Sequence, residues 1–299
     1  MREGTLHIKY LIIINPIAGN GKTQNLIPSI KSLLGSNNIQ HDLCFTSERG
    51  QAAELSKDGV DKGYTHIVAV GGDGTAHEVV NGLAGSSVIF GMIPSGSGND
   101  FPKAVGIPLD IQLSIEVLVR NSTRQIDVGM LGDQYFINGL GIGLDGAVAA
   151  RFSQMKKLRG EIGYLWGAII EAIRFRGFQI EISTENWKFR GAALLAGASN
   201  GQCHGGNFKL VPHARADDGL LDIYLFEDMS LTKRIVSLPR VLIGKHTNMS
   251  GVHFKQVSKA EITLDREIQA HLDGEPLLLG PGAHTISILP RALTVLSPL

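Results

Sequence analysis

The segment at residues 71–75 reads Gly-Gly-Asp-Gly-Thr and is the first candidate for chemistry. It follows the apolar run Ile67 to Val70 and precedes a predicted helix that carries Glu78. Backbone amides in such a turn, with a helix N-terminus behind them, form a site for phosphate oxygens. The Asp73 carboxylate can hold Mg²⁺ or accept a proton. A purely structural strand-to-helix turn is the alternative, but three glycines in four residues at a strand end favour a phosphate site.

Two other glycine-rich segments match known motifs only in part. Residues 15–23 end in Gly21-Lys22-Thr23 as a P-loop does, but Pro16 stands where a P-loop needs glycine. A different phosphate or adenine contact, or a plain turn, remains open there. Residues 141–146 satisfy G-x-G-x-x-G, but they follow several βα units instead of opening the sheet. This lone match is weak evidence, so we do not predict a dinucleotide site.

Three later segments carry hydroxyls or carboxylates in predicted turns. Residues 94–100 offer two serines and two glycines at a strand end, and they could close over a nucleotide or carry an acceptor. Residues 217–222 place aspartates before a strand, where they either bind a hard cation or form an Asp-Gly turn. Asp273-Gly274-Glu275 is a turn by default, and only its combination with the other motifs makes Glu275 a candidate proton acceptor.

Two further groups are interpreted as structural or surface features. Cys203-His204 has no partner pair at zinc spacing, so we predict a structural role. The basic run Lys156 to Arg159 is typical of a solvated face, although it could also contact anionic lipid.

The N-terminal elements that must position these loops alternate between strands and helices. This alternation predicts a parallel α/β sheet over residues 1–128, with the glycine-rich loops converging at the carboxyl ends of its strands. The expected elements are strands at 9–14, 40–45, 65–70 and 88–93, and helices at 24–34, 51–62, 75–83 and 111–119.

For residues 129–299 the pattern instead predicts a mainly antiparallel β domain with two helices. The tight boundary near residue 128 predicts a cleft between the domains, and the final strand could return to the first domain. Ser230 is a plausible N-cap for the second helix. The expected strands are 135–138, 178–183, 189–198, 220–226, 259–264, 268–272, 284–289 and 292–296, and the helices are 161–175 and 231–243.

The amino-acid composition indicates which partners the protein could bind and in which cellular compartment it is expected. The 299 residues contain 28 Lys+Arg and 28 Asp+Glu, a balance that argues against broad nucleic-acid binding. Two cysteines indicate a reducing, cytoplasmic setting. We expect neither a signal peptide nor a transmembrane segment.

Taken together and in this order, the motifs resemble the diacylglycerol kinase catalytic-domain family, meaning the bacterial YegS-like lipid kinases and their sphingosine kinase relatives. The Gly-Gly-Asp-Gly-Thr segment alone is shared with NAD kinases and, loosely, with phosphofructokinases. The later motifs are what single out the lipid kinases, namely residues 94–100, 136–146, 205–212, 218–222 and 273–275.

The resemblance implies an α/β nucleotide domain followed by a β-sandwich that holds the acceptor lipid, with ATP in the cleft. It implies that Glu275 accepts the proton of the lipid hydroxyl and that Asp73 organises the catalytic Mg²⁺. A structural Mg²⁺ would bind the Asp218 side chain and the carbonyl groups of Arg215 and Leu220. The implied ATP contacts are Asn15, Pro16, Ile17, Ala18, Gly19, Thr46, Gly72, Asp73, Gly74, Thr75, Glu78 and Ser97.

The chain departs from the family pattern at three positions. Ser97 stands where the family usually has Thr and keeps the hydroxyl, whereas Ser95 replaces a usual Leu. Asn207 replaces the last glycine of an expected triplet, where Asn would tolerate a left-handed backbone. No candidate catalytic group is lost.

The sequence therefore predicts transfer of the γ-phosphoryl group of ATP to a lipid hydroxyl, with Mg²⁺ as cofactor. It does not separate the roles of Glu275 and Asp73 as proton acceptor. An NAD kinase-like enzyme with a soluble acceptor, or a nucleotide- or lipid-binding module without turnover, are the alternatives. A lipid substrate implies peripheral contact with the inner face of the membrane.

Overall fold

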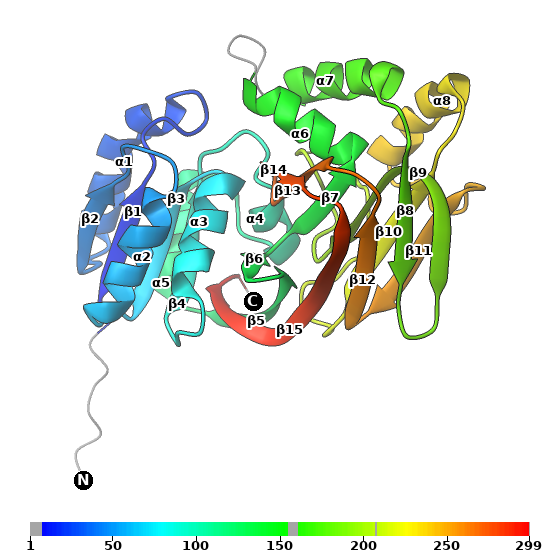
Figure 1. Cartoon of the computed structure of the whole chain (residues 1–299). Coiled ribbons are helices and arrows are strands. Elements are labelled where there is room, and N and C mark those ends of the chain that lie inside the picture. The colour runs from blue at the N-terminus through cyan, green and yellow to red at the C-terminus, as the bar shows by residue number, and fades with distance from the viewer. Residues whose placement is uncertain (1–7, 155–160, 207, 299) are drawn as a thin grey trace. The chain divides into compact units, whose positions relative to one another are not determined.

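A computed structural model describes residues 8–154, 161–206 and 208–298 (Figure 1). The chain forms two compact units. Unit 1 contains Met1–Ile126 and Ala292–Leu299, and unit 2 contains Asp127–Arg291. The chain passes from one unit to the other within two strands, β5 (Thr123–Leu131) and β15 (Gly282–Leu296).

Unit 1 is built on a parallel sheet with the strand order β4-β3-β1-β2. The end of β15 extends it, because Val295 pairs in parallel with Phe90 of β4. The strands are β1 (Tyr10–Ile14), β2 (His41–Phe45), β3 (His66–Gly71) and β4 (Ile89–Pro94), and the helices are α1 (Lys22–Ser36), α2 (Gln51–Asp61), α3 (Asp73–Leu83), α4 (Asp100–Val105) and α5 (Ile111–Arg120).

Apolar side chains on both faces of this sheet explain the helices that cover it. Ile12 and Val68 belong to a buried cluster with Ile30 and Leu34 of α1 and with residues of α5. The opposite face meets α2, since a Cβ on Gly59 would lie within 2.8 Å of side-chain atoms of Leu11 and Ile67. Strands that are apolar on both faces are typical of a parallel sheet between two helix layers.

Unit 2 is mainly antiparallel. Strand β9 pairs with β7, β8 and β10, and the path continues from β8 through β12 to β15. The elements are β6 (Gln134–Phe136), β7 (Gly139–Gly143), α6 (Leu144–Gln154), α7 (Glu161–Arg174), β8 (Phe178–Ser183), β9 (Lys188–Ser199), β10 (Leu221–Glu227), α8 (Leu231–Leu242), β11 (Val252–Val257), β12 (Lys259–Leu264), β13 (Ile268–Leu272) and β14 (Glu275–Leu279).

Two apolar clusters fill unit 2. One is formed by strand side chains such as Phe136, Ile180 and Ile262. The other joins Val148 of α6 and Val241 of α8 to Tyr224 and Phe226 of β10, so the three helices α6 to α8 pack against strands of this unit (Figure 1).

The expected fold class, an α/β domain followed by a mainly antiparallel β domain, is confirmed, but several elements differ. The strands expected at 284–289 and 292–296 form one strand, β15, which bends at Arg291 with φ 52°. Ser230 occupies the N-cap of α8 without making a side-chain cap bond. The elements α4, β5, β7, α6, β11 and β14 were not expected from the sequence.

Candidate functional site

The predicted nucleotide residues of unit 1 follow the carboxyl ends of neighbouring parallel strands. Strand β1 lies between β2 and β3, so the chain order reverses there, and ligands bind at such a switch point in open α/β sheets. The loop after β1 carries residues 15–19, Thr46 follows β2, and Gly72 follows β3. The Asn15 side-chain amide donates to Thr75 Oγ1 at 3.1 Å, which ties the first of these loops to the third.

Close backbone contact joins this third loop to the loop after β4. The Gly71 carbonyl accepts hydrogen bonds from the amides of Ser95 at 2.8 Å and Gly96 at 3.1 Å. A Cβ on Gly96 would lie only 2.3 Å from Gly72 Cα. The Ser95 hydroxyl, within 2.6 Å of Thr23 Oγ1, also connects the loop to α1. The loops after β1, β3 and β4 thus pack together at one edge of the sheet, where Ser97 is exposed.

The first turn of α3 has the features of an anion site. Gly72 is its N-cap, and no side chain caps the helix amides there. Asp73 begins the helix, and its Oδ1 accepts from the Phe101 amide at 3.0 Å, which fixes the start of α4. Backbone donors beside a carboxylate suit a nucleotide phosphate with its cation.

Glu78 has a clear structural contact. Its two carboxylate oxygens accept hydrogen bonds from the amides of Gly50 at 2.8 Å and Ala52 at 3.1 Å, at the N-terminus of α2. A carboxylate at a helix N-terminus is favourable because of the helix dipole. The predicted ATP contact through Glu78 is not tested by these bonds and stays a prediction.

In unit 2, Glu275 follows a tightly held two-residue turn. Leu272 pairs with Glu275, and the intervening Asp273 and Gly274 have φ of 51° and 87°, as a type I′ turn requires. The buried Asp273 carboxylate accepts from the amides of Asn138 at 2.8 Å, Gly139 at 3.0 Å and Ile137 at 3.1 Å. Asp273 is thus a structural anchor that fixes the backbone from which Glu275 projects.

The predicted structural metal loop, residues 215–220, is fixed by a residue that the sequence analysis did not single out. Asp127 is fully buried, and its carboxylate accepts from the amides of Gly219 and Arg291, each at 2.7 Å. Asp218 Oδ1 accepts from the Leu220 amide at 3.1 Å. Burial, followed by the charge of Asp218, raises the pKa of Asp222 to about 6. The loop therefore concentrates carboxylate oxygens, the ligands that hard cations prefer.

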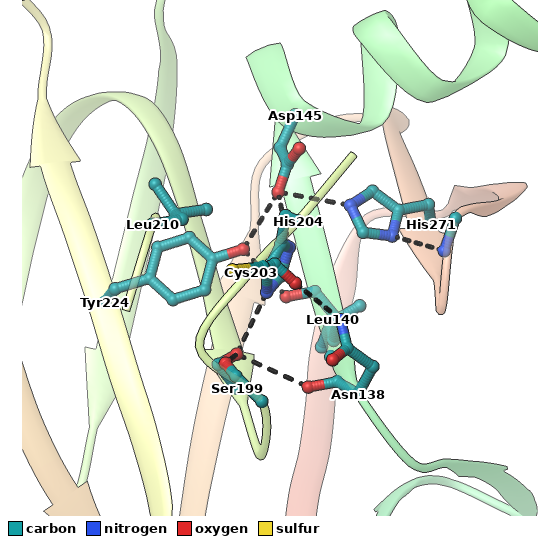
Figure 2. Close-up of polar contacts among 12 residues, drawn as sticks. Asn138, Leu140, Asp145, Ser199, Cys203, His204, Leu210, Tyr224 and His271 are labelled. Carbon is teal, nitrogen blue, oxygen red and sulfur yellow. Dashed lines mark hydrogen bonds and ion pairs between the residues drawn. The ribbon is translucent and has the colours of Figure 1, made fainter. Parts of the chain in front are cut away.

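A third polar group in unit 2 contains Asp145, His204 and His271 (Figure 2). All three side chains are buried, and both histidine rings contact Asp145 Oδ2, His204 through Nδ1 at 3.3 Å and His271 through Nε2 at 3.1 Å. Sequence analysis missed this cluster because its members come from separate segments of the chain. The structural role predicted for His204 stays a prediction, and the structure adds that His204 shares this carboxylate with a second histidine.

Comparison with known proteins identifies both halves of the chain. Residues 9–131 match the diacylglycerol kinase catalytic domain, and residues 139–297 match the YegS C-terminal NAD kinase beta sandwich-like domain. The chain belongs to the diacylglycerol kinase and YegS-like lipid kinase family. The family predicted from the motifs is thereby confirmed.

Individual relatives agree with this family. The chain is 33% identical over 240 residues to a "Probable lipid kinase YegS-like" of Pseudomonas putida, covering 79% of each chain. It is 29% identical over 269 residues to a "Diacylglycerol kinase" of Staphylococcus saprophyticus, covering 88% of each. The "Crystal structure of a putative diacylglycerol kinase from Bacillus anthracis str. Sterne" has a TM-score of 0.81 at 26% identity and covers 97% of both chains. A diacylglycerol kinase structure from the same organism, at 24% identity and a TM-score of 0.75, shares the fold over 97% of both chains.

Two expectations of the sequence analysis lie outside the described residues, namely the basic run Lys156 to Arg159 and the backbone conformation of Asn207. Among the described helices, none is both long and apolar enough to span a membrane.

Proposed function

We propose that this lipid kinase family member transfers the γ-phosphoryl group of ATP to the hydroxyl of a diacylglycerol-like lipid, with Mg²⁺ as cofactor. The observation that carries the proposal is the packed loop edge of unit 1, where backbone amides at the start of α3 adjoin Asp73. Transfer of a phosphoryl group depends mainly on positioning and electrostatic stabilisation. Backbone donors and carboxylates on a rigid framework suit that requirement.

The ATP phosphates would bind the amides of Gly72, Gly74 and Thr75, and Asp73 would hold the catalytic Mg²⁺. The adenosine would contact the loop after β1 and Thr46, with Ser97 and Glu78 completing the site. The position of all these residues in unit 1 supports the assignments.

Glu275 would accept the proton of the lipid hydroxyl, because it is the carboxylate presented by the anchored turn of unit 2. An ordinary carboxylate is a weak base, so it would act late, when charge has built up on the attacking oxygen. Asp73 is the alternative acceptor, and substitution of each residue separates the two.

The loop at residues 215–220 fits a structural Mg²⁺. Asp218 and the carbonyl groups of Arg215 and Leu220 would be its ligands, and the nearby buried Asp222 adds negative charge that a cation would offset. Bound there, Mg²⁺ would supply charge neutralisation to a loop that Asp127 already fixes.

The proposed function is tested with γ-labelled ATP, Mg²⁺ and mixed micelles of a lipid panel, with NAD assayed in parallel. We expect label in an extractable lipid, formed at least about 100-fold more slowly by Glu275→Gln and by Asp73→Asn. Labelled NAD would instead favour an NAD kinase-like enzyme, and ATP binding without transfer to any acceptor would favour a binding module. The exposed Asp265→Asn serves as the matched control.

We also propose that helix α8 forms a peripheral contact with an anionic lipid surface. Its apolar side chains Leu231, Ile235 and Val236 are 45%, 51% and 54% exposed, and Ile243 beyond its end is 60% exposed. Exposed Lys233, Arg240 and Lys245 flank them, and residues 231–245 contain neither Asp nor Glu. Apolar side chains bordered by cations are typical of interfacial helices.

Flotation with vesicles tests this contact. We expect binding to phosphatidylglycerol vesicles and reduced binding by Ile235→Glu/Val236→Glu, with Leu113→Glu, a 48% exposed residue of α5, as control. Equal flotation of all three proteins would remove α8 from the docking surface. Equal binding to vesicles of neutral phosphatidylcholine would remove the role of charge.

A further inference from the structure

The cluster of Asp145, His204 and His271 is a buried charged group that the proposed reaction does not use directly. Asp145 follows β7 at the start of α6, His204 lies in the segment after β9, and His271 lies in β13 (Figure 2). Their relative exposures are 8%, 2% and 4%. The Tyr224 hydroxyl lies 3.0 Å from the same Asp145 oxygen. Burying an ionised carboxylate is costly, so this arrangement requires compensating partners.

The tautomer of His271 follows from its neighbours. The Gly274 amide donates to His271 Nδ1 at 3.1 Å, so Nδ1 carries a lone pair. The ring proton of this neutral imidazole is therefore on Nε2, which lies 3.1 Å from Asp145 Oδ2. His271 thus links the carboxylate of Asp145 to the backbone of the turn that precedes Glu275.

His204 is the second histidine that faces Asp145. The Ser199 hydroxyl donates to the Gly201 carbonyl at 2.6 Å, so it accepts from His204 Nε2 at 2.9 Å. The other nitrogen, Nδ1, faces Asp145 Oδ2, where a lone pair would be repelled. Although burial opposes ionisation, the two facing histidines hold the pKa of Asp145 well below its usual value.

Gly141 of β7 leaves room for the contact between Asp145 and His271. A Cβ on Gly141 would lie 2.3 Å from both Asp145 Oδ2 and His271 Nε2. The same strand begins at Gly139, whose amide binds the Asp273 carboxylate. The turn before Glu275 is thus held at both of its residues, Asp273 by amides of residues 137–139 and Gly274 by His271.

We infer that Asp145 and His271 are positioning residues for Glu275. They hold the turn that precedes Glu275, and Glu275 accepts the proton of the lipid hydroxyl. This inference rests on the proposed function. Asp145 fixes the orientation and tautomer of the His271 ring, and the ring fixes the Gly274 amide. Glu275, the next residue, is thereby kept on a backbone that does not rotate as charge develops on the acceptor oxygen.

Two histidines and a carboxylate also have the composition of a metal centre, but the hydrogen bond from Gly274 argues against one here. A metal-bound Nε2 needs its lone pair, which would put the ring proton on Nδ1 and set two N–H groups against each other. The proton assignment therefore separates the two interpretations.

Kinetics of His271 variants in two backgrounds test the inference. His271→Gln removes the acceptor at the Nδ1 position, and we expect kcat to fall between about 10-fold and about 100-fold, with little change in KM for ATP. In the Glu275→Gln background the same substitution should change kcat by less than about twofold, because its effect acts through Glu275. His271→Asn places an amide oxygen near the Nδ1 position and should recover part of kcat.

A similar loss of kcat in both backgrounds, or no loss of kcat when Glu275 is present, would overturn the positioning role while leaving the proposed function standing. If the unsubstituted protein labels no lipid, the proposed function and the role that depends on it both fall. Ring nitrogen NMR of the ¹⁵N-histidine-labelled protein tests the geometry separately. We expect a proton on His271 Nε2, and a proton on Nδ1 or a stoichiometric bound metal would overturn the assignment.

Discussion

Replacing Asp273 by Asn tests how strongly the turn before Glu275 is anchored. The substitution keeps the shape of the side chain, and Asn tolerates the φ of 51° at this position. It removes the charge and turns one of two accepting oxygens into a donor. The Asp273 carboxylate serves three backbone amides, so one of them must lose its partner.

The magnitude follows from these three bonds. A hydrogen bond to a charged group contributes about 1.5–3 kcal/mol, and a buried amide left without a partner costs about 1–3 kcal/mol. We therefore expect Asp273→Asn to lower the free energy of unfolding of unit 2 by about 3–5 kcal/mol. Exposed Asp265→Asn should change it by less than about 0.5 kcal/mol.

Urea unfolding followed by circular dichroism measures the difference, provided that the m-value is unchanged. Hydrogen exchange of the amides of residues 137–139 should accelerate in the same variant, because those amides are the donors. A loss below about 1 kcal/mol with unchanged exchange would refute the reasoning that the carboxylate anchors the turn.

Three further predictions concern other contacts. Gly96→Ala should weaken ATP binding by about tenfold or more in calorimetry while the fold persists, because its Cβ would lie 2.3 Å from Gly72 Cα. The control Gly35→Ala, in α1, should leave the affinity unchanged, because its Cβ would have open space and its φ is not positive. Arg234→Lys should speed hydrogen exchange at the end of α7. The Arg234 guanidinium donates to the carbonyls of Ala172 and Phe175, and a lysine lacks the planar guanidinium group. The control Arg240→Lys, at an exposed residue, should leave exchange there unchanged. Burial lowers the pKa of His246, so protonation favours the unfolded chain and stability should fall as pH drops below about 6.5. Melting temperatures at several pH values should show a smaller slope for His246→Gln, and an equal slope would contradict the assignment.

The parallel sheet of unit 1 could be predicted because its strands and helices carry strong local patterns. Apolar β-branched strands alternate there with amphipathic helices, and the Gly-Gly-Asp-Gly-Thr segment marks a strand end without ambiguity. By contrast, β7 reads Gly-Leu-Gly-Ile-Gly, and three glycines in five residues hide a strand from propensity. Gly141 leaves room for Asp145 and His271, Gly139 for His204 and Gly143 for Phe178, and only the tertiary structure reveals these contacts.

The candidate site also has parts that could be predicted from the sequence and parts that could not. Loops after strands could be placed at one edge from topology alone. The structural role of Asp127 could not, because its amide partners Gly219 and Arg291 lie far along the chain and backbone donors leave no mark in a sequence. Cys203-His204 fails every zinc spacing, yet folding brings His204 to a carboxylate and a second histidine from other segments.

The return of β15 to unit 1 has a consequence for biosynthesis. Val295 pairs with Phe90, so the β4 edge of the nucleotide-binding sheet is completed by residues made after all of unit 2. At about 5–20 residues per second, the ribosome needs on the order of 10–30 s to translate the intervening segment. During that interval β4 is an open edge, which nascent chains and chaperones can pair with. A truncation that removes the end of β15 would therefore leave the β4 edge of unit 1 without this pairing partner.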